Sequence, residues 1–386
     1  MRMTQLKTIA DIQTGPFGSQ LHKEDYVETG TPIVTVEHLG NRVFTEQNLP
    51  RVSDSDKARL IKYTLSTGDI VFSRVGSVDR CSYVDKSHDG WMFSGRCLRV
   101  RPTELVDSLY LYYYFCLEET KQFVRNIAVG ATMPSINTKL LGEVEIALPD
   151  LNNQKRIAAV LSSLDDKIEN NQKLNDNLQQ QAAALFSSLY DRSNTEVRFT
   201  DLIQILGGGT PKTGENTYWN GKIAFFTPKD VGTPYTLITE KTISKEGLSH
   251  CNSRLYPVNT VFVTARGTVG KVGMSGVPMA MNQSCYALVG KETHQLLVYF
   301  YTLKAVDRLK HKASGAVFDA ITTRDFESEQ IMKLSDDDAK AFLCVAKPMF
   351  QEVLNNNIEN LRLSTLRDSL LPKLMSGEID VSAVQL

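Results

Sequence analysis

The chain lacks most of the motifs that identify an enzyme. It contains no GxSxG, HExxH or GxxxxGK[ST] motif, no GxGxxG after a predicted strand, and no adjacent pair of prolines. These absences argue against a serine hydrolase, a zinc protease, a P-loop enzyme, a dinucleotide-binding enzyme and an amino-methyltransferase with an Asn-Pro-Pro-aromatic signature. None of the six histidines lies in a recognisable ligand pattern. We therefore expect a non-catalytic chain that binds no cofactor itself.

The chain also lacks the patterns of secreted, metal-bound and membrane proteins. Its six cysteines are scattered without a CxxC pair, so their spacing predicts neither a zinc site nor a disulfide framework. No apolar run reaches the ~18 residues that suggest a transmembrane helix. The first residues contain no apolar signal-peptide core. We expect a cytoplasmic protein with no membrane partner.

One stretch resembles the PD…DxK signature of metal-dependent nucleases. Pro149 and Asp150 are followed by Asp165, Asp166 and Lys167. The carboxylates of that signature must converge on one metal ion, from neighbouring strands. Here the second group falls about four turns, or roughly 22 Å, along a predicted helix. We therefore predict no metal site.

The most regular pattern is a long heptad repeat over residues 150–191. Apolar residues and two asparagines alternate at spacings of four and three, which is typical of a coiled-coil seam. Asp150 can cap the start, and no proline or glycine interrupts the stretch. A helix of this length would extend for about 58 Å at 1.5 Å per residue, so its apolar face needs a partner. Leu174 and Phe186 lie beside the seam, and we expect them on exposed faces that partners cover.

A second copy of the seam occurs 185 residues later, where Asn171 and Asn175 correspond to Asn356 and Asn360. Ser335 and Asp338 form a candidate capping box there. Pro372 predicts an end or a kink, and Gly377 a stop. Each helix alone could pack in a core or form a homomeric coiled coil. Two copies in one chain favour an intramolecular pair, in which buried asparagines would oppose register slip.

The helix-pair interface is predicted from the seam positions of the two copies. They are Ile157, Leu161, Leu164, Ile168, Asn171, Asn175, Leu178, Leu185, Phe342, Met349, Val353, Asn356, Asn360, Leu363 and Leu370.

The remaining sequence predicts two globules of similar plan. The first has β-prone runs at 32–36, 69–72 and 97–100, a helix over 108–127 and a last strand at 143–148. The second has strands at 223–227 and 260–264 and a helix over 296–312. The predicted fold class is α+β, with two globular domains separated by two long antiparallel coiled-coil helices and a pseudo-twofold internal repeat. The boundaries are 1–149, 150–191, 192–334, and 335–386 with the C-terminal tail.

A glycine-containing turn follows a β-run in each globule, at 72–80 and 263–271. Such turns can present arginine and hydroxyl groups to phosphates and base edges. The alternative is an ordinary solvated hairpin. Basic residues outnumber acidic ones, six to three, over 73–101, and 259–290 contains no acid at all. The glycine-rich stretches 15–19 and 207–214 are better explained as turns than as phosphate loops. The candidate DNA contacts are Phe17, Ser19, Arg74, Ser77, Arg80, Lys86, Arg96, Arg99, Lys212, Thr213, Lys229, Arg266, Thr268 and Lys271.

These features together resemble a known family, the specificity subunits of type I restriction–modification enzymes. The resemblance is carried by Gly15-Pro-Phe-Gly-Ser-Gln-Leu21, Gly209-Thr-Pro211, Gly267-Thr-Val-Gly270, Gln154-Lys-Arg-Ile-Ala158, and Leu370-Leu-Pro-Lys-Leu-Met-Ser-Gly-Glu-Ile379. In this order, they cover nearly the whole chain.

The resemblance implies two target-recognition domains that each read one half of a bipartite site in double-stranded DNA. It also implies two methyltransferase (modification) subunits and, in some systems, restriction/translocase subunits as partners. S-adenosylmethionine, ATP and Mg²⁺ would then be used by those partners. The alternative from another class is a helical scaffold that organises partners without reading DNA.

Overall fold

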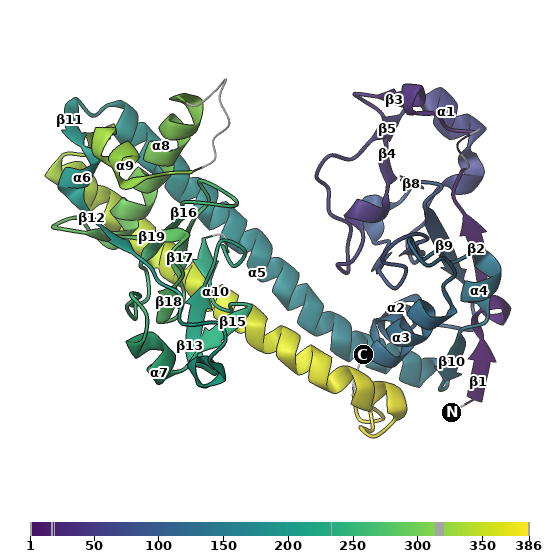
Figure 1. The fold of residues 1–386 in the computed structure, drawn as a ribbon. Coiled ribbons are helices and arrows are strands. Elements are labelled where there is room, and N and C mark those ends of the chain that lie inside the picture. The colour runs from purple at the N-terminus through teal and green to yellow at the C-terminus, as the bar shows by residue number, and fades with distance from the viewer. Residues whose placement is uncertain (1, 17, 19, 233, 313–319, 385–386) are drawn as a thin grey trace. The chain divides into compact units, whose positions relative to one another are not determined.

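A computed structural model describes residues 2–16, 18, 20–232, 234–312 and 320–384. The chain divides into two compact units, unit 1 (residues 1–168 and 362–386) and unit 2 (residues 169–361). Each contains a sheet-rich globule and part of two 41-residue helices, α5 (Leu151–Asp191) and α10 (Asp336–Ser376) (Figure 1). The division passes through both helices, so the predicted boundaries, which keep each helix whole, stay a prediction.

In its described residues, unit 1 contains ten short strands and four short α-helices besides its parts of α5 and α10. The strands are β1 (Arg2–Gln5), β2 (Ala10–Thr14), β3 (Tyr26–Val27), β4 (Thr31–Val34), β5 (Arg51–Val52), β6 (Ile70–Ser73), β7 (Cys81–Tyr83), β8 (Met92–Phe93), β9 (Cys97–Pro102) and β10 (Glu145–Leu148). The helices are α1 (Asp54–Arg59), α2 (Ser108–Cys116), α3 (Glu118–Ile127) and α4 (Thr138–Gly142).

The strands of unit 1 form an antiparallel sheet in the order β2-β9-β6-β7, a second sheet in the order β3-β5-β4-β8, and the pair β1-β10. Helix α2 packs on the first sheet through buried aromatic rings, and Phe115 meets Phe72 of β6 at 4.7 Å between ring centroids. The same core includes Leu161 of α5 and Leu374 of α10. The globule and its helix segments therefore form one packed body.

Unit 2 repeats this plan with longer elements. Its strands are β11 (Thr195–Arg198), β12 (Ile203–Gly207), β13 (Trp219–Phe226), β14 (Tyr235–Thr236), β15 (Lys241–Ile243), β16 (Val261–Thr264), β17 (Val272–Ser275), β18 (Met279–Met281), β19 (Cys285–Gly290) and β20 (Gln330–Lys333). Its helices are α6 (Phe199–Leu202), α7 (Lys245–Ser249), α8 (Gln295–Lys312) and α9 (Thr323–Ser328).

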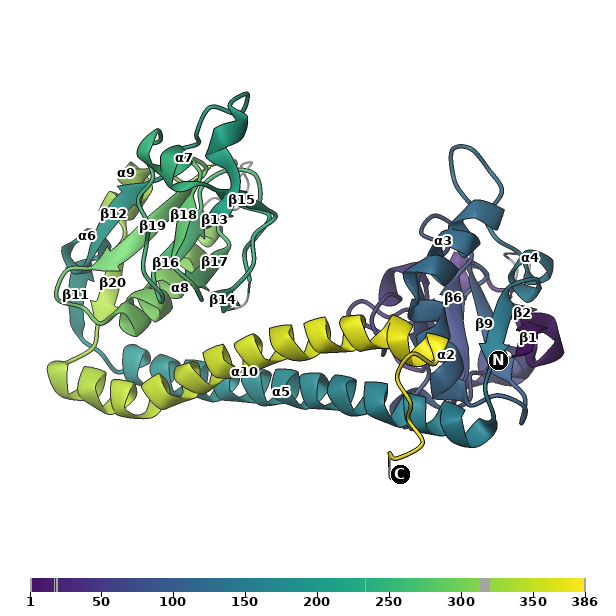
Figure 2. The ribbon, with the colours of Figure 1, turned by 90° about the horizontal axis from the view of Figure 1, so that it is seen from below.

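The main sheet of unit 2 has the order β12-β19-β16-β17-β14, which repeats the order of unit 1 and adds β14 at the edge. The parallel pair β4-β8 has its counterpart in β13-β18, and the antiparallel pair β1-β10 in β11-β20. Helix α8 packs against β16, β17 and β19 (Figure 2). The two globules are thus copies of one α+β fold, as the repeat predicts.

Both long helices begin with the predicted caps. The Asp150 carboxylate accepts a hydrogen bond from the Asn153 amide at 3.0 Å. The Ser335 hydroxyl accepts one from the Asp338 amide at 3.1 Å and donates to the Asp338 carboxylate at 2.9 Å. Helix α10 continues past Pro372, where the sequence predicted an end or a kink, and ends before Gly377, which has a φ of 79°.

The helices pair in antiparallel directions within each unit. In unit 2, the Asn171 side-chain amide donates to Asn360 at 2.8 Å, and that of Asn356 donates to Asn175 at 2.9 Å. The fifteen residues of the predicted helix-pair interface are all buried or half-buried, which is compatible with that assignment.

Two local expectations were wrong. The helix predicted over 108–127 is broken at Leu117, whose ψ of 133° is extended, and Glu118 and Glu119 then begin α3 with the acidic residues that a helix N-terminus favours. Phe186, which the heptad pattern leaves beside the seam as an exposed apolar residue, is only 1% exposed. It packs on Phe300, Tyr301 and Phe342, because α8 covers that side of α5. Leu174, the other flanking residue, is exposed as expected.

Candidate nucleic-acid interface

The two predicted glycine turns have the same construction. In unit 1 the turn joins β6 to β7, and in unit 2 it joins β16 to β17, both antiparallel pairs. Gly76 and Gly267 occupy the same place, with φ values of 75° and 81° that favour glycine. The backbone amide of Ile136 donates a hydrogen bond to the Arg74 carbonyl at 2.9 Å, and the amide of Ile321 donates one to the Ala265 carbonyl at 2.9 Å. A chain segment after the helices α2–α3 or α8 therefore supports each turn.

In unit 2, the turn holds its shape through hydrogen bonds that leave its tip exposed. The Thr264 hydroxyl accepts from the Lys271 amide at 2.9 Å and donates to the Thr268 carbonyl. The Thr268 hydroxyl donates to the Pro228 carbonyl at 3.2 Å. Arg266, Thr268 and Lys271 are all exposed. The cationic side chains of Arg266 and Lys271 thus extend from a turn that these hydrogen bonds hold in place.

In unit 1, the turn is held from several directions. The Gly76 amide donates to the Pro134 carbonyl at 2.8 Å, and the Arg74 amide donates to the Arg96 carbonyl at 2.8 Å. The Arg74 guanidinium donates to the Gly95 carbonyl at 3.1 Å, which places it near Arg96. Ser77, Arg80 and Arg96 are exposed, and Arg74 is half-buried. The structure therefore brings Arg74 and Arg96 together at one end of the main sheet.

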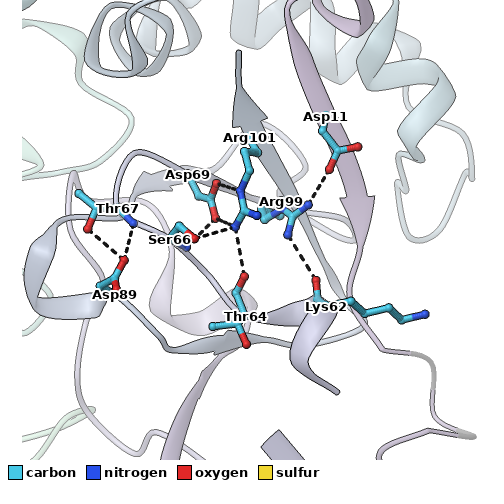
Figure 3. A network of polar contacts seen from close by, with 9 residues as sticks. All are labelled: Asp11, Lys62, Thr64, Ser66, Thr67, Asp69, Asp89, Arg99 and Arg101. Carbon is cyan, nitrogen blue, oxygen red and sulfur yellow. Dashed lines mark hydrogen bonds and ion pairs between the residues drawn. The ribbon is translucent and has the colours of Figure 1, made fainter. Parts of the chain in front are cut away.

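Arg99 does not fit the predicted role of a DNA contact. It lies on β9, is 4% exposed, and donates to the Asp11 carboxylate of β2 at 2.6 Å (Figure 3). The neighbouring Arg101 donates to both oxygens of buried Asp69, at 2.7 Å each. Because Arg99 is buried and already paired with a carboxylate, its side chain cannot extend to DNA, and it is not a candidate contact.

The other predicted contacts are spread over both globules. Lys86, Lys212, Thr213 and Lys229 are exposed, and the Lys229 ammonium lies 3.8 Å from the Glu240 carboxylate. Phe17 and Ser19 lie outside the described residues.

Each glycine-rich stretch contains a glycine that lies very close to another part of the backbone. A Cβ on Gly208 would lie 2.1 Å from the Asn282 carbonyl oxygen, so only glycine fits there. Gly15 approaches the Ser94 carbonyl equally closely.

The carboxylates of the nuclease-like stretch have structural partners. Asp165 accepts from Arg367 and Tyr113 at 2.6 Å each, and Asp166 accepts from Arg42 at 2.6 Å. Sequence reasoning missed these contacts, since they join residues far apart in the chain. Within the described ranges, no group of three or more His, Cys, Asp or Glu side chains could hold a metal ion. In the same ranges, no helix is long and apolar enough to cross a membrane.

Comparison with known proteins gives one consistent result. The family model described as "Type I restriction modification DNA specificity domain" matches residues 1–180 and 192–333. The chain is 25% identical to the MjaIX specificity subunit of Methanocaldococcus jannaschii, over 72% of this chain and 71% of that protein. It is 24% identical to the HindI specificity subunit of Haemophilus influenzae, over 82% and 88%. The crystal structure of an S subunit of a type I system from M. genitalium matches with a TM-score of 0.63 and 16% identity, over 97% of this chain and 95% of that one.

Proposed function

Because the chain belongs to the type I restriction–modification DNA specificity family, we propose that each globule reads one half of a bipartite DNA target through its glycine turn. The chain is the DNA sequence-recognition subunit of such a system. It carries two specificity domains, and this role is non-catalytic. The competing idea of a scaffold that does not read DNA is not favoured by this family.

The observation that carries the proposal is the repetition of the turn. The same backbone bonds support residues 74–80 and 265–271, while the exposed side chains differ between the two. Arginine can donate two parallel hydrogen bonds to guanine, and hydroxyl groups can bond to either base edges or phosphates. A constant frame with variable side chains suits two readers of different sequences.

The charge of the turn region in unit 2 favours contacts with the phosphates of the DNA backbone. Residues 259–290 contain Arg266 and Lys271 and no carboxylate. Phosphate contacts position a protein on DNA and supply salt-dependent affinity, while base contacts supply the sequence preference. We assign Arg266 to base reading and Lys271 to phosphate contact.

The partners and cofactors follow from the same proposal. Two methyltransferase subunits, with restriction/translocase subunits where present, would assemble on this chain and use S-adenosylmethionine, ATP and Mg²⁺. Candidate sites for these subunits are the exposed apolar residues of the long helices, Leu174, Val345 and Leu366. Removal of apolar surface from water is favourable, so a partner that covers these side chains would bind more tightly.

The decisive experiment is sequencing of methylated bases in cells that carry this gene with its partner genes. We expect a bipartite methylated motif that disappears when the gene is deleted. Exchange of residues 207–312 for those of another specificity subunit should change one half of the motif and leave the other half intact. A methylation pattern that is unchanged by the deletion would overturn the proposal.

A further inference from the structure

The first globule is attached to the long helices by a buried carboxylate. Asp165 lies on α5 and is 5% exposed. Its two oxygens accept hydrogen bonds from the Tyr113 hydroxyl of α2 and from the Arg367 guanidinium of α10, at 2.6 Å each. Burial raises the pKa of the Tyr113 hydroxyl, which therefore stays protonated and donates. One side chain thus ties together the globule and both helices of unit 1.

Further polar contacts continue this joint along α5. The Arg42 guanidinium, from the connection between β4 and β5, donates to Asp166 at 2.6 Å and to the Ser162 carbonyl at 3.3 Å. The Gln154 side chain is 2% exposed and accepts from the Asp107 amide at 2.9 Å, beside the start of α2. The globule therefore meets α5 through directional bonds over about three helical turns.

Unit 2 uses a different chemistry at the corresponding place. Residue Phe350 is the repeat equivalent of Asp165, at the offset of 185 that relates the two heptad seams. Its ring meets Tyr299 at 5.8 Å and Phe300 at 5.5 Å between centroids. Phe186 of α5 stacks on Phe300 at 5.0 Å. The second globule is therefore attached by aromatic packing, which is less directional than charged hydrogen bonds.

The polar joint is better explained by geometry than by stability. A buried ion pair often adds no net stability over apolar residues of similar volume. A charged hydrogen bond, however, has a narrow range of lengths and angles, so it restricts how the globule can tilt on the helix. A DNA half-site displaced by one base pair moves about 3.4 Å along the axis and rotates by roughly 34–36°. A globule held at a fixed angle would reject that displacement.

On the basis of the function proposed above, we propose that Asp165 is a positioning residue that sets which spacer length between the two half-sites the protein accepts. It touches no DNA. It acts by holding Tyr113 and Arg367, and so fixes the first globule on α5 and α10, with Arg42 and Asp166 as a second point of attachment.

The test uses the assembled methyltransferase with its motif known from methylated-base sequencing. The probes are DNA duplexes that carry both half-sites at the native spacer or at one base pair more or fewer. The measurement is the ratio of the methylation rates at native and altered spacers. We expect Asp165→Asn, which keeps the side-chain volume but loses the charge, to lower this ratio by about tenfold or more, because one attachment is weakened. The half-site preferences should stay unchanged.

Arg42→Gln provides a second variant at the edge of the joint, and should lower the same ratio less. It decides the question if Asp165→Asn does not assemble. Asp176→Asn is the matched control, since Asp176 is an exposed carboxylate on the same helix, and its ratio should equal that of the unaltered enzyme.

The outcomes separate this inference from the proposed function. If the unaltered enzyme methylates no bipartite motif, the proposed function fails. If the unaltered enzyme methylates a bipartite motif, the ratio of the methylation rates at native and altered spacers decides the inference. Variants that keep this ratio, even if they methylate every duplex more slowly, would show that Asp165 is only structural and would overturn the inference.

Discussion

The Asn356 side-chain amide donates a hydrogen bond to the Asn175 side-chain oxygen at 2.9 Å, between α10 and α5 of unit 2. Asn171 and Asn360 form the matching bond at 2.8 Å. In the internal repeat, Asn171 is equivalent to Asn356 and Asn175 to Asn360. The bond from Asn171 to Asn360 and the bond from Asn356 to Asn175 are therefore equivalent to each other, as a local twofold axis between the two helices requires.

We predict that Asn356→Ala lowers the free energy of unfolding by about 1–3 kcal/mol, because it leaves the buried Asn175 oxygen without a donor. Urea unfolding of the purified chain would measure this. Replacement of both residues by leucine should recover much of the loss, since apolar residues at these positions pack without unsatisfied groups.

Asn170→Ala is the control, because Asn170 is exposed on the same helix. Alanine is the better helix former, so this exposed substitution should not lower the free energy of unfolding. A loss of equal size at Asn170 would show that the buried bond does not explain the result.

The sequence predicted the repeated elements well, because their signals are local. The heptad seam predicted both long helices, and the capping residues Asp150 and Ser335 predicted where they begin. The turns around Gly76 and Gly267 could be found for the same reason. Glycine at a fixed distance after a β-run is visible without knowledge of any tertiary contact.

The errors concern residues whose surroundings come from far along the chain. Arg99 has the composition of a DNA contact, but Asp11, 88 residues earlier, neutralises it. Phe186 is covered by α8, more than a hundred residues later. The joint at Asp165 needs partners from α2 and α10 together. The periodicity of the sequence does not show which distant side chains contact Asp165 in the folded protein.

The start of each long helix also predicts a dependence of stability on pH. The Asn153 amide, by its hydrogen bond, holds the pKa of Asp150 below its ordinary value, and the Arg192 guanidinium does so for Asp338. Carboxylates with a lowered folded-state pKa bind fewer protons than in the unfolded chain. The stability that they contribute is complete above the ordinary pKa of about 3.9 and is lost as the pH falls through the folded-state value.

Asp150→Asn/Asp338→Asn removes both titrating groups and keeps a good capping residue at position 150. We expect this variant to lose less stability than the unaltered chain between pH 5 and pH 3, a window that spans the ordinary pKa of about 3.9. Thermal unfolding at several pH values would compare them. Parallel curves would mean that neither cap contributes to the acid sensitivity.

For Arg266, the prediction separates base reading from phosphate contact. Arg266→Ala should weaken binding of the assembled enzyme to its own motif by roughly 1–3 kcal/mol, and binding to unrelated DNA by less. Titrations on both DNAs at several salt concentrations would measure this. Equal losses with a smaller salt slope would reassign Arg266 to a phosphate. Lys245→Ala, an exposed lysine of α7, should change neither affinity.

The last prediction concerns the helices as a spacer. Four residues inserted in α5 between Gln172 and Lys173, together with four in α10 between Ile358 and Glu359, would lengthen the pair by about 6 Å. The insertions leave the bond of Asn171 to Asn360 on one side and that of Asn356 to Asn175 on the other. Each half of the pair therefore keeps its register, and the caps at Asp150 and Ser335 are untouched.

If the two globules read half-sites whose separation the helices set, this variant should methylate motifs with a spacer longer by about one or two base pairs, at 3.4 Å per step. Methylated-base sequencing should show both half-sites unchanged. An insertion in α5 alone is the control. It displaces the asparagine pairs, because α10 is not lengthened to match, and should reduce methylation at every spacer. A native spacer in the doubly lengthened protein would mean that the helix pair does not set the distance between the half-sites.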